Sequence, residues 1–129
     1  MHRILPIAVA AISLASCTSN PSPQSGAAAA SDRQCFVASS VSGFHALDRD
    51  TVLVTVGANR TYQLDILGTC QDIDWSNRIG IRSTSGSSWV CRGQDAELIV
   101  PGPAGVDRCP VLGVRLLSPE EVRAARRRS

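Results

Sequence analysis

The chemistry that this sequence offers most clearly is that of cysteine. Of its five cysteines, the last four are widely spaced: Cys35, Cys70, Cys91 and Cys109. An even set of cysteines in an exported domain is typical of disulfides, and four cysteines allow three pairings that sequence alone does not separate. We predict that Cys70 pairs with Cys91, on either side of one predicted hairpin. Cys35 would then pair with Cys109 and tie the first strand to the last.

Zinc is the competing use of these cysteines. Structural zinc sites usually place their ligands in close pairs, two to four residues apart. The four cysteines are scattered, and His45 is the only histidine beyond the first two residues. We therefore expect no metal and no cofactor.

Catalytic chemistry would have to use His45. Asp48 or Asp50 could orient this histidine, but the sequence has no Gly-x-Ser-x-Gly elbow, and a triad is defined by geometry rather than by spacing. Aspartates in a turn commonly bond the local backbone. Asp48 with Asp50, or Asp72 with Asp74, could help to hold calcium, but the full oxygen-rich loop is missing. We expect no catalytic residue and no enzyme.

The N-terminal segment has the pattern of an export signal. Met1-His2-Arg3 is positive, residues 4–15 are mainly apolar, and Leu14-Ala15-Ser16-Cys17 resembles the lipobox of a bacterial lipoprotein. The apolar run is shorter than the roughly 20 residues that span a bilayer. We predict that residues 1–16 are a cleaved lipoprotein signal peptide and that Cys17 carries the lipid. An ordinary signal peptide, with Cys17 incidental, is the alternative.

The lipid would hold the protein on a membrane, because two or more acyl chains anchor firmly whereas one chain binds reversibly. Thr18 follows the cysteine, in place of the aspartate that retains lipoproteins at the inner membrane of enteric bacteria. We expect the periplasmic face of the outer membrane. Residues 17–31 have no bulky apolar side chain after the cysteine and should form a flexible linker.

The charge balance excludes one class of partner. The chain has 13 Lys+Arg, all of them arginine, and 11 Asp+Glu. Four arginines crowd the last seven residues: Arg123, Arg126, Arg127 and Arg128. The rest is close to neutral, which argues against nucleic-acid binding. The cluster itself is typical of a solvated tail, with contact to anionic lipid or another polyanion as the alternative.

Residues 32–118 alternate short apolar runs with turn residues, as a disulfide-bonded β-domain does. The run 51–56 is β-branched almost throughout, and 62–66 alternates apolar with polar residues, so we predict a hairpin with one buried face. The sequence predicts a mainly β fold, a small antiparallel sheet curled into a sandwich or barrel.

The remaining elements are assigned with the same signals. We predict a second hairpin from 79–82 and 89–91 with a serine-rich tip, and Ile73 and Trp75 as core contacts of an irregular segment. For Trp75 and Trp89 a binding surface is the alternative, and core packing is favoured for both. Further strands are predicted at 36–44, 96–100 and 111–117. Ser118, Pro119 and Glu121 have the spacing of a helix cap, so residues 119–129 should form a short basic C-terminal helix or tail.

Several short motifs resemble an uncharacterised bacterial family. They are Cys35-Phe36-Val37, Phe44-His45-Ala46-Leu47-Asp48, Tyr62-Gln63-Leu64, Cys70-Gln71-Asp72-Ile73, Cys91 with Asp95, and Cys109. The chain is similar over residues 35–117 to the domain of unknown function 6491 (DUF6491), whose members are small exported proteins with cysteines in this order. The resemblance implies no activity.

These observations together predict an envelope lipoprotein with a non-catalytic binding or scaffolding domain. Its expected partners are the membrane, through the lipid anchor, and another envelope protein. The alternative is a periplasmic inhibitor or small-ligand-binding module, similar in format to the small lipoprotein inhibitors of lysozyme. That similarity is one of architecture, and architecture does not carry function.

Overall fold

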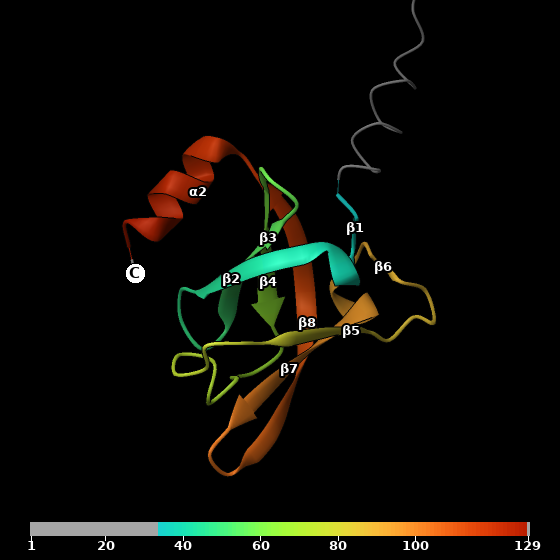
Figure 1. The fold of residues 1–129 in the computed structure, drawn as a ribbon. Helices are drawn as coiled ribbons and strands as arrows, with labels where there is room; N and C mark the ends of the chain where they lie inside the picture. Colours follow the sequence, from blue (N-terminus) through green and yellow to red (C-terminus); the bar gives the residue numbers. More distant parts are fainter. Residues whose placement is uncertain (1–33, 129) are drawn as a thin grey trace, which may run out of the picture.

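The computed structural model of the chain describes residues 34–128 (Figure 1). The predicted signal peptide, the lipidation of Cys17 and the predicted linker lie outside the described residues. Within 34–128, no helix is long and apolar enough to cross a membrane.

Six strands form one antiparallel sheet in the order β2-β3-β4-β8-β7-β5. The strands are β2 (Val41–Ala46), β3 (Thr51–Val56), β4 (Arg60–Ile66), β5 (Gly80–Ser83), β7 (Ala96–Gly102) and β8 (Gly105–Leu117). The sheet curls into a half-barrel, so the predicted mainly β, curled antiparallel fold is confirmed. A separate ribbon pairs β1 (Phe36–Val37) with β6 (Trp89–Val90). Two short 3-10 helices, η1 (Ala38–Ser40) and η2 (Gly93–Asp95), connect these parts.

The predicted hairpin of β3 and β4 is confirmed, with Val54 opposite Tyr62. Its alternating apolar residues fill the inside of the half-barrel, where Val54, Tyr62 and Leu64 are fully buried. The Tyr62 ring packs against Phe36 of β1 with ring centroids 4.8 Å apart. Its hydroxyl donates a hydrogen bond of 3.1 Å to the Cys35 carbonyl, so the core tyrosine also fixes the start of the β1 ribbon.

Strand β8 joins the two halves of the sheet. Its first part pairs with β7 through Pro110, and its second part pairs with β4 from Val111 onward. The β4–β8 register shifts between Asp65 and Ile66, which face Gly113 and Val111, so Leu112 is the extra residue of a bulge. A bulge bends a strand and increases its twist, which lets one long strand serve both halves of a curled sheet.

The predicted second hairpin is wrong. Strand β5 pairs with β7, with Ile81 opposite Leu98, and β6 pairs with β1. Between β6 and β7, Gly93 lies so close to the Leu112 backbone that a Cβ atom there would overlap it. The packing of η2 on β8 therefore separates β6 from the sheet, and a local alternation of residues does not specify such distant partners.

Three further expectations need correction. The predicted strand over 36–44 is interrupted by η1, and the last strand begins at Gly105 instead of at residue 111. Ile73 is buried as predicted, but Trp75 is 84% exposed and is not a core residue. An isolated aromatic residue in an irregular segment gives no periodicity from which its burial can be read.

The cysteines form disulfides, but in a different pairing from the predicted one. The bonds join Cys35 to Cys91 and Cys70 to Cys109. Phe36 faces Val90 in the β1–β6 ribbon, so Cys35 and Cys91 flank a paired position. Cys70 follows β4 and lies beside Cys109 because β4 pairs with β8. The predicted pairing depended on the second hairpin, and it fails with that hairpin.

The C-terminal helix α2 (Pro119–Arg126) is confirmed with its cap. The Glu121 amide donates to the Ser118 hydroxyl over 3.2 Å, and the Glu121 carboxylate accepts from the Ser118 amide over 2.8 Å. The buried side of α2 packs through Val122 and Ala125 on Leu53, on the outer face of the sheet. This contact explains why β3 is buried on both faces.

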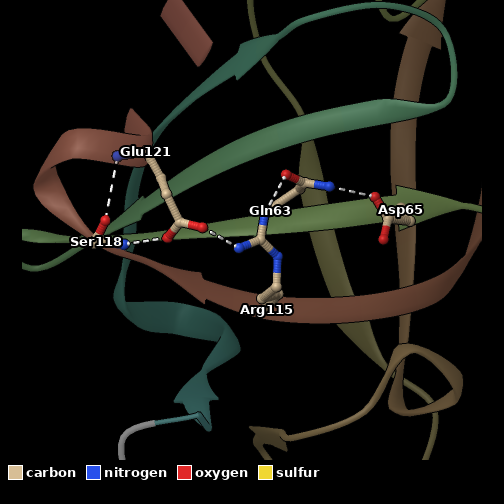
Figure 2. A network of polar contacts seen from close by, with 5 residues as sticks. All are labelled: Gln63, Asp65, Arg115, Ser118 and Glu121. Carbon is tan, nitrogen blue, oxygen red and sulfur yellow. Dashed lines mark hydrogen bonds and ion pairs between the residues drawn. The ribbon is translucent and has the colours of Figure 1, made fainter. Parts of the chain in front are cut away.

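A polar network links α2 to the same outer face, as Figure 2 shows. Arg115 of β8 donates to Glu121 over 2.6 Å and to Gln63 over 3.2 Å. Gln63 in turn donates to Asp65 over 2.8 Å. The hydrogen bond from the Ser118 amide, together with Arg115, lowers the pKa of Glu121 from its ordinary value.

Peptide mapping without reduction tests the disulfide pairing. Proteolysis of the oxidised chain should release one fragment that joins Cys35 to Cys91 and another that joins Cys70 to Cys109. The two loops span 56 and 39 residues, and the chain-entropy model gives about 4 kcal/mol of stabilisation for each bond. A Cys35–Cys109 fragment would contradict the arrangement of β1 and β6.

Glu121→Gln tests the polar network. The variant should have a lower urea midpoint at pH 7, because glutamine can cap the helix but loses the charge that faces Arg115. The folded pKa lies below the unfolded value of about 4.3, so this stabilisation is full above that pH and is lost as the pH falls through the folded pKa. The two midpoints should converge at acidic pH. Glu120→Gln, in the same helical turn but outside the network, is the control and should change less at pH 7.

Candidate functional site

The 67–79 loop joins β4 to β5 and carries the most exposed large apolar side chain in the described part of the chain. Trp75 is 84% exposed, more than the other exposed large apolar residues. Those residues are Leu67, Trp89, Val106 and Leu112. Such a side chain on a polar loop is a candidate for contact with a ligand or partner, because removing aromatic surface from water is favourable.

The loop is held firmly at its base. Cys70 is fully buried, is bonded to Cys109, and donates its amide hydrogen to the Arg49 carbonyl over 2.8 Å. Ile73 inserts into the core with 1% exposure. Arg49 also contacts Asp74 over 3.2 Å, so the loop is fixed to the 47–50 turn by both backbone and side chain.

The tip of the loop is a tight turn. The amides of Trp75 and Ser76 both donate to the Asp72 carbonyl, over 3.2 and 3.0 Å. The Ser76 hydroxyl donates to the Arg78 carbonyl over 2.6 Å. These bonds fix the backbone on both sides of Trp75, so the exposed indole projects from a rigid support.

An open cleft of about 600 Å³ lies between this loop and the edge strand β2. Its walls come from both segments and comprise Phe44, His45, Ala46, Leu47, Ile73, Asp74, Ser76 and Asn77. The fold thus brings His45 to the same cleft as Asp74 and Ser76. Asp74 is paired with Arg49, however, and the Ser76 hydroxyl is directed to a backbone carbonyl. Nucleophilic catalysis needs a hydroxyl bonded to its base, whereas the Ser76 hydroxyl donates to the Arg78 carbonyl.

A second cleft, of about 290 Å³, lies on the other side of the loop, against the turn that ends β7. We call it the Trp75 cleft, and its walls are Asp72, Trp75, Ser76, Asn77, Arg78, Pro101, Gly102 and Pro103. The Asp72 side chain lies so close to Gly102 that a Cβ atom there would overlap the carboxylate. A glycine at this position therefore lets the loop and the β7–β8 hairpin meet and close one side of the cleft.

The remaining predicted acids form no metal site. Asp48 accepts from the Asp50 amide over 3.1 Å, and Asp50 accepts from the Thr51 hydroxyl over 3.1 Å, as expected of aspartates in a turn. Asp72 and Asp74 diverge, one toward Gly102 and the other toward Arg49. Within residues 34–128, no three histidine, cysteine or acidic residues are grouped so that they could hold a metal ion.

The two turn aspartates influence each other's ionisation. The hydrogen bond between their side chains raises the pKa of Asp50, because the protonated form of Asp50 can donate to Asp48. Partial burial opposes ionisation of Asp48, but hydrogen bonds from Asp50 and Thr51 outweigh it and lower the pKa of Asp48. Both carboxylates belong to the 47–50 turn, and neither of them lines the cleft of about 600 Å³, which we call the wide cleft.

None of the C-terminal arginines lines either cleft; Arg128 instead lines a smaller cleft of about 280 Å³ together with Leu47 and Asp48. Arg123, Arg126, Arg127 and Arg128 are all exposed. Helix α2 lies at the upper left of Figure 1, whereas the β7–β8 hairpin reaches the bottom of the view. The arginines therefore do not contribute to the candidate site at the 67–79 loop.

The Trp75 cleft was not predicted from the sequence. Its walls come from two segments that are about 25 residues apart, residues 72–78 and 101–103, and the β5–β7 pairing, with Gly80 opposite Ile99, brings them together. One signal was present. In Asp74-Trp75-Ser76-Asn77-Arg78 a lone tryptophan stands among polar residues, with no apolar residues at the spacing of a strand or helix face. Such a residue has no predicted face to bury.

Comparison with known proteins identifies the family. Neither a search of curated proteins nor a search of solved structures found a significant match. A family model described as "Family of unknown function (DUF6491)" matches residues 1–129, the whole chain. This agrees with the cysteine spacing and the short motifs that the sequence shares with that family. The chain therefore belongs to the DUF6491 family.

Proposed function

We propose that this protein is an envelope lipoprotein, anchored through Cys17 to the periplasmic face of the outer membrane, and that its β-domain is a non-catalytic binding module. The anchor is supported by the sequence around Leu14-Ala15-Ser16-Cys17, which has the form of a lipobox. The binding role is supported by the surface around the 67–79 loop.

The observation that carries the binding role is the exposure of Trp75. An indole that is 84% exposed gains free energy when a ligand or partner covers it. Tryptophan is also among the residues most enriched at the energetic centres of interfaces. The Cys70–Cys109 disulfide and the Arg49–Asp74 pair hold its loop in place, so little further ordering would be lost on binding.

The position of Trp75 suits a tethered protein. The described chain begins next to β1, at the upper end of Figure 1, and the β7–β8 hairpin beside the Trp75 cleft lies at the opposite end. A lipid on Cys17 followed by a polar linker would attach the domain by its β1 end. Because this linker is expected to be flexible, the domain would be able to present the Trp75 cleft to other components of the envelope.

A small-ligand-binding module is the second candidate, and the wide cleft beside His45 favours it. Its volume of about 600 Å³ lies within the usual range of about 300–1,000 Å³ for ligand pockets. The cleft combines apolar walls from Phe44 and Ile73 with polar groups from His45 and Asn77. Both candidates are binding functions and share the 67–79 loop.

Metabolic labelling with radioactive palmitate tests the anchor. The wild-type chain should incorporate label and sediment with outer-membrane density on a sucrose gradient. Cys17→Ser removes the only acceptor sulfur that the lipobox provides, so this variant should carry no label. Incorporation of label into Cys17→Ser, or its absence from the wild type, would rule out lipidation at this residue.

Sedimentation with isolated envelopes tests the binding role. The full chain with Cys17→Ser should bind washed envelopes saturably, and Trp75→Ala should weaken that binding by about tenfold or more, as loss of an interface centre does. Leu112→Ala is the matched control, because Leu112 is 59% exposed but does not line either cleft. Equal binding by the Trp75 and Leu112 variants would contradict the proposed site.

A further inference from the structure

We infer that the Trp75 cleft is a saccharide-binding site, in which the indole stacks on one face of a sugar ring while Asp72, Asn77 and Arg78 bond its hydroxyl or acetamido groups. This ligand class deepens the binding role proposed above and rests on it.

The apolar wall is formed by one aromatic side chain and two prolines. Trp75 lines the cleft together with Pro101 and Pro103. The face of an indole ring is electron-rich, and it attracts the weakly positive C–H groups on one face of a pyranose. The prolines widen this apolar surface, and their fixed rings hold its shape.

The polar side of the cleft has unused hydrogen-bonding capacity. Within residues 34–128, the side chains of Asp72, Asn77 and Arg78 make no hydrogen bond or ion pair, whereas the neighbouring Asp74 and Ser76 side chains are engaged. A carboxylate accepts, a guanidinium donates, and an amide does both. Together they can pair with adjacent hydroxyl groups, each of which donates and accepts.

The charge and the backbone of the cleft disfavour other ligand classes. Asp72 and Arg78 balance each other, so the cleft has no excess charge that would attract a polyanion. Pro101 and Pro103 have no amide hydrogen, which prevents this end of β7 from offering a regular ladder to an added peptide strand. A neutral ligand with one apolar face and a polar edge meets both conditions.

The size and rigidity of the cleft fit a short saccharide. Its volume of about 290 Å³ lies just below the usual range of about 300–1,000 Å³ for ligand pockets, which suits a short saccharide held over part of its length. The bonds from the Trp75 and Ser76 amides to the Asp72 carbonyl fix the loop tip, and the Asp72 side chain lies against Gly102 of the opposite wall. Groups held in place before binding lose little entropy, which matters for a weakly held ligand.

Titration by NMR tests this inference directly, because the chain has only two tryptophans, Trp75 and Trp89. The ¹⁵N-labelled full chain with Cys17→Ser is titrated with the β-1,4-linked trimer of N-acetylglucosamine and, separately, with maltotriose. The indole N–H signal of Trp75 should shift saturably with at least one trimer, with a Kd of about 1 mM or lower. The Trp89 signal should stay in place. Trp75→Phe assigns the two signals.

Three variants locate the contacts. Trp75→Ala should weaken binding by about tenfold or more, and Asn77→Ala by about threefold to tenfold, as loss of a stacked ring and of a hydrogen bond predict. Leu112→Ala should bind like the parent. Backbone spectra of each variant show whether it is folded. In Trp75→Ala, which lacks the indole signal, the backbone shifts of the 67–79 loop report binding instead.

Two results would overturn the inference. One is the absence of any shift at Trp75 with either trimer at about 10 mM, tenfold above the expected Kd. The other is saturable binding that Trp75→Ala leaves unchanged. If the saccharides fail while sedimentation with envelopes still depends on Trp75, the ligand class is wrong and the binding role stands. If sedimentation fails as well, the proposed function falls with it.

Discussion

The pairing of β8 with two different strands is the constraint on which this structure depends. The strand contacts β7 through its first part and β4 through its second, so it alone connects the two halves of the sheet. The bulge at Leu112 lets it do so while the sheet curls around one core. Because the β4–β8 and β7–β8 ladders meet at residues 110 and 111, they also set the positions of the loops at their ends.

Two segments beside the six-stranded sheet each contain a disulfide cysteine pair or half of one. The β1–β6 ribbon is closed by Cys35–Cys91, and the 67–79 loop is bonded to β8 through Cys70–Cys109. Neither segment has enough ladder hydrogen bonds to be fixed by pairing alone. In a small domain with a modest core, covalent links of this kind supply order that hydrophobic burial does not.

The candidate site follows from that attachment. A loop that is bonded to the central strand and buries Ile73 in the core can present its tryptophan to solvent. The same loop forms a wall of both clefts, through Ser76 and Asn77. The 67–79 loop thus carries the most exposed aromatic side chain of the described residues together with polar groups that line both clefts.

The sequence by itself determined the parts of this protein that depend on neighbouring residues. The alternation along 51–66 fixed the β3–β4 hairpin, and Ser118, Pro119 and Glu121 fixed the cap of α2, because hairpins and caps are stabilised by contacts within a few residues. Only the tertiary structure decided the partners of β5 and β6, the disulfide pairing and the Trp75 cleft. These features join segments that are distant in the chain, and their partners are chosen by the packing of η2 on β8 and by the double pairing of β8, which leave no periodic trace in the sequence.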